Sequence, residues 1–278
     1  LVGSEMCIRD RYYTYCMFCT DDKHPNDLLE KGHIDYIVRR AIKAGVDPII
    51  AVKCASHHAA RYFLLNNRGA IAPGFLADFV VIDNFDDFNI LEVYKKGKLM
   101  FDGKTVTPFE APEIDPHLVK RSHETFHVAH LEATDFIESR PRAVLGMVPG
   151  EIVTTDAGYA EKISVEDDIL KIAVIERHKN THHIGIGYIK GYGLKSGAVA
   201  TSISHDSHNI IVVGANEEDM AAAVNRVVEL GGGIVVMDDG KVLGELQLQI
   251  AGIMSEAPLI EVNEALENAK EQAFKLGV

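Results

Sequence analysis

The stretch TDDKHP, residues 20 to 25, places two carboxylates and an imidazole directly after the apolar run YYTYCMFC. Asp21, Asp22 and His24 could transfer protons or bind a divalent cation, because carboxylate oxygens and imidazole nitrogens serve both purposes. Acidic residues at the C-terminal end of a barrel strand are typical of such sites. The alternative is an acidic turn that caps the next helix, since Asp and Pro favour turns. Residue types alone leave both interpretations open.

A second polar cluster, SHDSHN, occupies residues 204 to 209 between the strand-like runs AVATSI and NIIVVG. His205, Asp206 and His208 could line a pocket at a strand end or an oligomer contact. The alternative is a structural turn whose side chains bond to their own backbone. A metal site is the least supported interpretation, because two histidines three residues apart on a turn fix no coordination geometry.

The adjacent histidines and the cysteines are residue types that can bind metals, but each group has a simpler interpretation. His57 and His58 are adjacent on an expected helix and diverge by about 100°, which favours a packed or solvated pair. The cysteines, all in the first fifth of the chain, form no disulfide framework; they are Cys7, Cys16, Cys19 and Cys54. This cysteine usage indicates a reducing, cytoplasmic setting.

Composition excludes several classes of partner. The chain has 278 residues, 47% of them hydrophobic, which is enough for a sizeable core. Its formal net charge of -13 repels phosphate backbones and argues against nucleic acid. No apolar run approaches the roughly 20 residues that a membrane helix needs. We therefore expect no nucleic acid and no membrane partner, but a small neutral or cationic ligand.

The first third of the chain alternates one expected strand with helices. Residues 12 to 19 are rich in aromatic side chains and predict a buried strand that ends at TDDKHP. Residues 34 to 45 have apolar side chains at helical spacing and end in a glycine. Asp47 is expected to cap one continuous helix over residues 48 to 64, with proline at its first position.

The remaining elements are read from shorter patterns. Short strands FVVID, ILEVYKKG and KLMFDG predict a compact β segment, and a polar, proline-rich stretch follows it. DILKIAVIER, HHIGIGYIKG, AVATSI and NIIVVG predict further strands. Asn216 is expected to cap the helix EEDMAAAVNRVVEL, Asp239 and Gly240 to turn a hairpin, and a final amphipathic helix to end the chain.

The order of these features resembles a known superfamily. A strand, TDD, two helices and then GAIAPGFLADFVVID resemble the end of a metal-dependent amidohydrolase. Together with SHDSHNIIVVG and the acidic C-terminal unit, FCTDDKHPNDL resembles bacterial adenine deaminases. The resemblance covers residues 12 to 278.

The resemblance implies an α/β plus α+β fold. Residues 12 to 66 would be the last strand and closing helices of a (β/α)8 barrel, and residues 67 to 107 the tail of a small β-sandwich. A linker over residues 108 to 124 would precede a mixed α+β domain over residues 125 to 278. Residues 1 to 11 show no clear period and are interpreted as a non-native tail.

The resemblance also implies a chemistry, the hydrolytic deamination of adenine to hypoxanthine and ammonia. Asp21 would bind a divalent metal, manganese or iron, and take a proton from the metal-held water. Strand alternation would place Asp21 with Cys19 and Met17 on the inside of a barrel, with Asp22 as the alternative ligand. His205, Asp206 and His208 are the candidate substrate-binding residues, and a homo-oligomer is expected.

The histidines and the glutamate that the family carries on earlier barrel strands do not occur in this sequence. One carboxylate is not a metal site, so we expect this chain to be inactive alone. Two alternatives remain: an amidohydrolase that opens a cyclic amide or removes an acetyl group, and a non-catalytic oligomerisation module.

Overall fold

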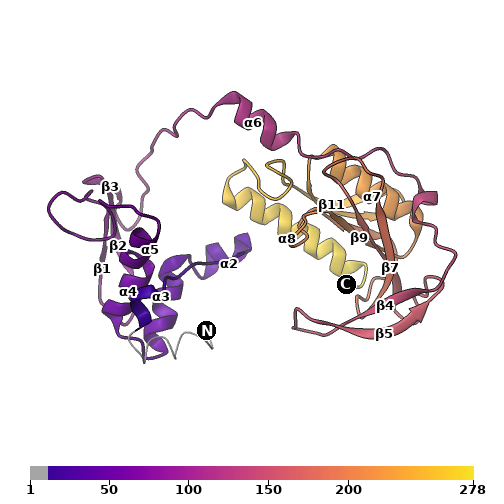
Figure 1. The fold of residues 1–278 in the computed structure, drawn as a ribbon, viewed down its shortest axis with the longest axis horizontal. Coiled ribbons are helices and arrows are strands. Elements are labelled where there is room, and N and C mark those ends of the chain that lie inside the picture. Colours follow the sequence, from indigo (N-terminus) through magenta and orange to yellow (C-terminus); the bar gives the residue numbers. More distant parts are fainter. Residues whose placement is uncertain (1–11) are drawn as a thin grey trace. The chain divides into compact units, whose positions relative to one another are not determined.

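The computed structural model describes residues 12 to 278 and divides into two compact units (Figure 1). One unit ends at Pro112 and the other spans Glu113–Val278. Each unit has its own sheet and its own hydrophobic core. The expected non-native tail lies outside the described residues. In the part of the chain that is described, no helix is long and apolar enough to cross a membrane.

The first unit combines short helices with a three-stranded antiparallel sheet of order β1-β2-β3. Its helices are η1 (Tyr12–Tyr15, a 3-10 helix), α2 (Pro25–Glu30), α3 (Ile34–Lys43), α4 (Pro48–Ala55) and α5 (His57–Tyr62). Its strands are β1 (Phe79–Ile82), β2 (Ile90–Lys95) and β3 (Lys98–Phe101).

The core of this unit lies between α3 and α4. Val38 and Ala41 of α3 pack with Ala51 of α4, and Phe88 joins them from the loop between β1 and β2. All four side chains are at most 6% exposed. The helix predicted over residues 34 to 45 is confirmed as α3, and its apolar side is the side that is buried.

The strand predicted over residues 12 to 19 does not form in this chain. Tyr12–Tyr15 forms η1, and the next five residues have no regular secondary structure. A strand needs a neighbour whose backbone groups complete its ladder of hydrogen bonds. Among the described strands, none pairs with this segment. Its backbone groups bond to helices instead.

The helix expected over residues 48 to 64 is interrupted. Asp47 caps α4 as predicted, and its carboxylate accepts from two backbone amides of the first turn. The helix breaks at Ser56, whose hydroxyl donates to the carbonyl oxygen of Val52 at 2.6 Å. A serine that bonds back to the preceding turn weakens and bends a helix. The result is two helices, α4 and α5.

The second unit is built on an eight-stranded sheet of order β11-β10-β8-β9-β6-β7-β4-β5. Its strands are β4 (Arg142–Met147), β5 (Thr154–Ala160), β6 (Ile169–Ile175), β7 (Ile184–Lys190), β8 (Ala198–Thr201), β9 (Ile210–Gly214), β10 (Gly233–Asp238) and β11 (Lys241–Gln247). Its helices are α6 (Pro116–His123), η2 (Ala133–Phe136, 3-10), α7 (Glu217–Glu229) and α8 (Leu259–Lys275). All strand pairs are antiparallel except β4 with β7.

Two helices cover the two faces of this sheet. Along β9, Ile210 and Val212 belong to the core beneath α7, whereas Val213 belongs to the core beneath α8. This is the alternation that a strand buried on both faces requires. The mixed α and β composition of the chain is therefore confirmed at this level.

Local signals in this unit are confirmed where they are strongest. The Asn216 side chain caps α7 by accepting from the Asp219 amide at 2.7 Å. Asp239 and Gly240 form the two-residue turn between β10 and β11, both with positive φ. The buried Asp219 carboxylate accepts from the Gly240 amide at 2.9 Å, so one aspartate joins the helix start to the turn.

Four elements of this region were not predicted: η2, β4, β5 and α6. Strands β4 and β5 form a hairpin at one end of the sheet, and β5 is the edge strand. Five of its seven residues are exposed, so it lacks the buried alternation by which a strand is recognised. Helix α6 lies inside the stretch predicted as a linker, where Asp115 caps it by accepting from the His117 amide at 2.9 Å.

Candidate functional site

The segment that leads to Asp21 is fixed to α4 and α5 by backbone contacts. The Phe18 amide donates to the Cys54 carbonyl oxygen at 3.0 Å. Nδ1 of His58 lies 3.0 Å from the Cys16 carbonyl oxygen, and the His58 side chain is buried. His58 therefore serves in packing.

Side chains of this segment alternate between the helices and the surface. Cys16 and Phe18 are partly buried, and Phe18 packs against the core of the unit. Met17, Cys19 and Asp21 are exposed. The segment thus presents its odd-numbered side chains on the side away from the core, although it is not a strand.

Asp21 and Asp22 lie together in a turn after this segment. Asp21 has a φ of 52°, a left-handed conformation that Asp tolerates better than most residues. The Asp22 amide donates to Oδ1 of Asp21 at 3.0 Å. Both side chains are exposed, so both carboxylates are accessible.

These residues do not form a metal centre by themselves. Among residues 12 to 278, no group of three or more His, Cys, Asp or Glu side chains could hold a metal ion. A catalytic divalent metal takes about three protein ligands, and Asp21 offers one carboxylate. A metal site that uses Asp21 needs further ligands from outside the described residues.

The SHDSHN loop connects β8 to β9 and is held at both ends. Ser202, just before it, is fully buried; its Oγ accepts from the Gly233 amide at 2.8 Å and donates to Gly252. At the other end, Nε of Arg177 donates to the carbonyl oxygen of His208. In the middle, Nε2 of His178 lies 2.8 Å from the carbonyl oxygen of Ser207.

The structure brings two of the three predicted loop residues into contact. The rings of His205 and His208 meet edge to face, with centroids 5.0 Å apart. His205 and Asp206 are exposed, whereas His208 is half-buried. Nδ1 of His208 and Oδ1 of Asn209 are buried and have no hydrogen-bond partner within the described residues. The loop thus combines a fixed base, an exposed tip and two polar atoms with unused bonding capacity.

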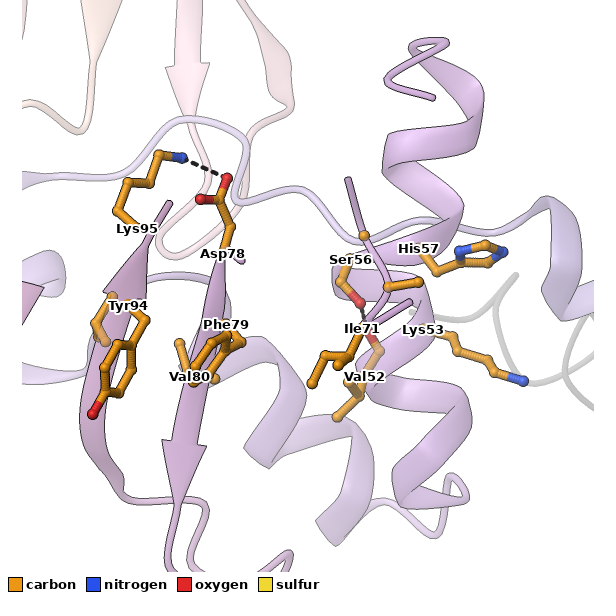
Figure 2. A pocket seen from close by; sticks show the side chains of 13 residues that line it. Val52, Lys53, Ser56, His57, Ile71, Asp78, Phe79, Val80, Tyr94 and Lys95 are labelled. Atoms are coloured by element: carbon orange, nitrogen blue, oxygen red, sulfur yellow. Dashed lines mark hydrogen bonds and ion pairs between the residues drawn. The ribbon is translucent and has the colours of Figure 1, made fainter. Parts of the chain in front are cut away.

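A groove with a mainly apolar lining lies elsewhere, in the first unit. This groove, of about 720 Å³, runs between α4 and the β1-β2 strands. Figure 2 shows Val52 and Ile71 on one side of it and Val80 on the other. Ile71 is 89% exposed and Val80 is 48% exposed, so the groove is open to solvent. None of the predicted site residues lines it.

The carboxylate that lines this groove, Asp78, is already paired. A backbone hydrogen bond from Lys96 lowers the pKa of Asp78, and the carboxylate also bonds to Lys95 at 3.1 Å and to Arg68. A carboxylate held in this way is a structural anchor and a poor proton acceptor. The groove is therefore lined mainly by apolar side chains, and its carboxylate is no candidate base for catalysis.

Sequence reasoning missed the residues that hold the SHDSHN loop. Arg177 is 2% exposed and lies two residues after β6. Its guanidinium donates to the carbonyl oxygens of Thr125 at 3.0 Å and Ala251 at 2.9 Å, in addition to that of His208. Burial lowers the pKa of Arg177. These partners are 31 to 74 positions away in sequence, so no local pattern could have revealed them.

Two family models match the chain. Residues 8 to 100 match the amidohydrolase family, and residues 151 to 278 match the adenine deaminase C-terminal domain.

Curated relatives cover nearly the whole chain. Proteins named adenine deaminase from Kosmotoga olearia and Desulfatibacillum aliphaticivorans are each 42% identical to it, over 97% and 94% of the chain. A third, from Petrotoga mobilis, is 39% identical over 98%. The matches cover 48%, 47% and 49% of these relatives, so the chain spans about half their length. The chain is thus similar to the adenine deaminases over nearly its whole length, with a segment that matches the amidohydrolase family followed by one that matches the adenine deaminase C-terminal domain.

Proposed function

We propose that this chain is the C-terminal part of an adenine deaminase, which hydrolyses adenine with water to hypoxanthine and ammonia. The observation that carries the proposal is the continuous similarity to adenine deaminases over 97% of the chain. The activity belongs to the complete enzyme, because the chain spans about half the length of those relatives. We place that enzyme in the cytoplasm, which the absence of a disulfide framework supports.

In the complete enzyme, the first unit would contribute the end of a (β/α)8 barrel and the tail of a β-sandwich. The amidohydrolase match over residues 8 to 100 supports this assignment. The segment before Asp21 would become the last barrel strand once a neighbouring strand supplied its missing hydrogen bonds. Its exposed odd-numbered side chains would then face the barrel interior.

Asp21 is our candidate for the catalytic carboxylate, with Asp22 as the alternative. This choice is supported by the direction of the Asp21 side chain. It is exposed on the same side of the segment as Met17 and Cys19, whereas Phe18 packs against the core. A divalent metal, manganese or iron, would supply the activated water in the complete enzyme. The Asp21 carboxylate would accept a proton and return it as ammonia departs, since it is accessible and forms no ion pair in the described part of the chain.

We propose that His205, Asp206 and His208 contact the purine. Imidazole and carboxylate groups can donate to or accept from the polar edge of adenine. The exposed tip of the loop, with His205 and Asp206, supports this role. A structural turn would bury its polar groups in hydrogen bonds.

We further propose that the enzyme is a homo-oligomer. The supporting observation is the apolar surface of the β4-β5 hairpin, where Ile152, Val153 and Tyr159 are 102%, 60% and 76% exposed. Exposed apolar side chains at a sheet edge are typical of protein contacts. Light scattering of the complete enzyme would measure its mass, and Tyr159→Asp should lower that mass if the hairpin forms the contact.

Hypoxanthine formation from adenine tests the proposed function. The complete enzyme, loaded with manganese or iron, should convert adenine, whereas the 278-residue polypeptide should not exceed a metal-only blank. Conversion of a cyclic amide or an N-acetylated sugar with no action on adenine would favour another amidohydrolase. No activity on any of these substrates, with an unchanged oligomer, would favour a non-catalytic module.

A further inference from the structure

A single buried guanidinium connects three segments around the SHDSHN loop. Nε of Arg177 donates to the His208 carbonyl oxygen, Nη1 to Thr125 and Nη2 to Ala251. The ring of Phe126 lies beneath the guanidinium, 4.2 Å from Cζ to the ring centroid. All three guanidinium nitrogens therefore donate to uncharged oxygens, and the Phe126 ring covers one face of the guanidinium.

Burying this guanidinium among neutral oxygens costs free energy of folding. A charged side chain that is 2% exposed loses its hydration, and neutral carbonyl oxygens compensate a cation less well than a carboxylate does. In return, the three bound carbonyl oxygens are held in fixed relative positions, because the guanidinium donors form a rigid planar fork. The position of His208 is thereby fixed relative to residues 125 to 127 and to Ala251.

The surroundings of Arg177 are built to keep it in place. Its carbonyl oxygen accepts from the His127 amide at 2.8 Å, so its backbone and side chain hold the same segment. A Cβ at Gly252 would lie 3.0 Å from Nη2 of Arg177 and 2.8 Å from Cε2 of Phe126. Only a glycine leaves room there for the guanidinium and the ring.

Fixing His208 also fixes the exposed tip of the loop. The His205 ring contacts the His208 ring, and His205 lies three residues before the carbonyl oxygen that Arg177 holds. The opposite end of the loop is anchored independently by the buried Ser202. Between these anchors the tip has little freedom to change its direction.

We propose that Arg177 is a positioning residue that holds the SHDSHN loop in the conformation in which His205 meets the purine. This inference rests on the proposed function of the loop. Arg177 touches no substrate and acts through His205. A lysine cannot reproduce the role, because an ammonium is a compact point donor that cannot hold three separate carbonyl oxygens in a plane.

A double-mutant cycle in the complete enzyme tests the proposal, with kcat and KM for adenine and the free energy of unfolding measured for each variant. Arg177→Lys should lower kcat/KM by about 10-fold to 100-fold, the range expected when reacting groups are displaced by about 1 Å. In a His205→Ala background the same substitution should have a much smaller effect, because only the position of His208 is left for it to disturb. Arg226→Lys, at a partly exposed arginine paired with Glu245, is the matched control and should leave kcat/KM unchanged.

The outcomes separate this proposal from the function of the loop. If His205→Ala alone leaves kcat/KM unchanged, His205 does not meet the purine, and its proposed role is overturned together with that of Arg177. If His205→Ala lowers kcat/KM but Arg177→Lys does not, or if the two losses simply add, only the role of Arg177 is overturned. Should Arg177→Lys fail to fold, Phe126→Leu loosens the guanidinium while keeping its hydrogen bonds, and the same cycle decides.

Discussion

Gly252 lies so close to Arg177 that a Cβ on the glycine would be 3.0 Å from the guanidinium Nη2. Gly252 also has a φ of 77°, in the left-handed region. Backbone conformation and close contact therefore both require glycine at this position. Gly240, in the turn between β10 and β11, has a similar φ of 69° but no atom within 4 Å of such a Cβ.

The first prediction uses this pair of glycines. Gly252→Ala and Gly240→Ala should each lose roughly 1–2 kcal/mol of unfolding free energy from the left-handed backbone. Gly252→Ala should lose clearly more, because the methyl group also meets Phe126 and Arg177. Urea unfolding of the 278-residue chain measures both losses. Equal losses of unfolding free energy would contradict the prediction, since they would show that Arg177 and Phe126 can move aside for a methyl group.

The second prediction concerns stability at acid pH. A hydrogen bond from Arg142, with Nε at 2.6 Å, is the main cause that lowers the pKa of Glu138 from 4.5 to about 2. A lowered carboxyl pKa stabilises the folded state above the unfolded-state pKa, and this contribution is lost as the pH falls through the folded-state pKa. The unfolding free energy should therefore fall between about pH 4.5 and 2 in part because of Glu138.

Glu138→Gln should remove this part of the pH dependence, and Arg142→Ala should reduce it, since the main cause of the shift is gone. Thermal unfolding of the chain measured across this pH range checks both variants. An unchanged slope in Glu138→Gln would contradict the assignment.

The third prediction concerns the tip of the SHDSHN loop. His205→Ala in the complete enzyme should lower kcat/KM for adenine while the unfolding free energy changes by no more than about 0.5 kcal/mol, the range for an exposed side chain. His208→Ala should lower kcat/KM too, at a greater cost in stability, since its ring is half-buried. His130→Ala, at an exposed histidine of the same unit, is the control. A loss of stability with normal kinetics in the folded fraction would identify a structural turn.

Elements whose signals are local could be predicted from the sequence. The Asn216 cap, the Asp239 and Gly240 turn and the Asp47 cap each depend on residues within a few positions of one another. The apolar stripe of α3 was likewise sufficient to identify its buried face. In these places intrinsic preference and tertiary packing agree.

Elements that depend on partners far away in the sequence could not be predicted in this way. Residues 12 to 19 have a strand-like composition, but a strand forms only beside a neighbour, and the described residues supply a helix instead. The continuous helix over residues 48 to 64 was also predicted wrongly, because the chain breaks at Ser56 into α4 and α5. The framework of the SHDSHN loop depends on Arg177, whose bonds span up to 74 positions.

The most direct test of the account is the rate of hypoxanthine formation by the complete enzyme carrying Asp21→Asn, with Asp22→Asn as the matched control. Asparagine keeps the shape of the side chain but cannot accept the proton, and loss of a general base costs about 10²- to 10⁴-fold. We predict a loss of this size in kcat/KM for Asp21→Asn and a much smaller one for Asp22→Asn. A larger loss for Asp22→Asn, or full activity in Asp21→Asn, would contradict the assignment of Asp21 as the catalytic carboxylate.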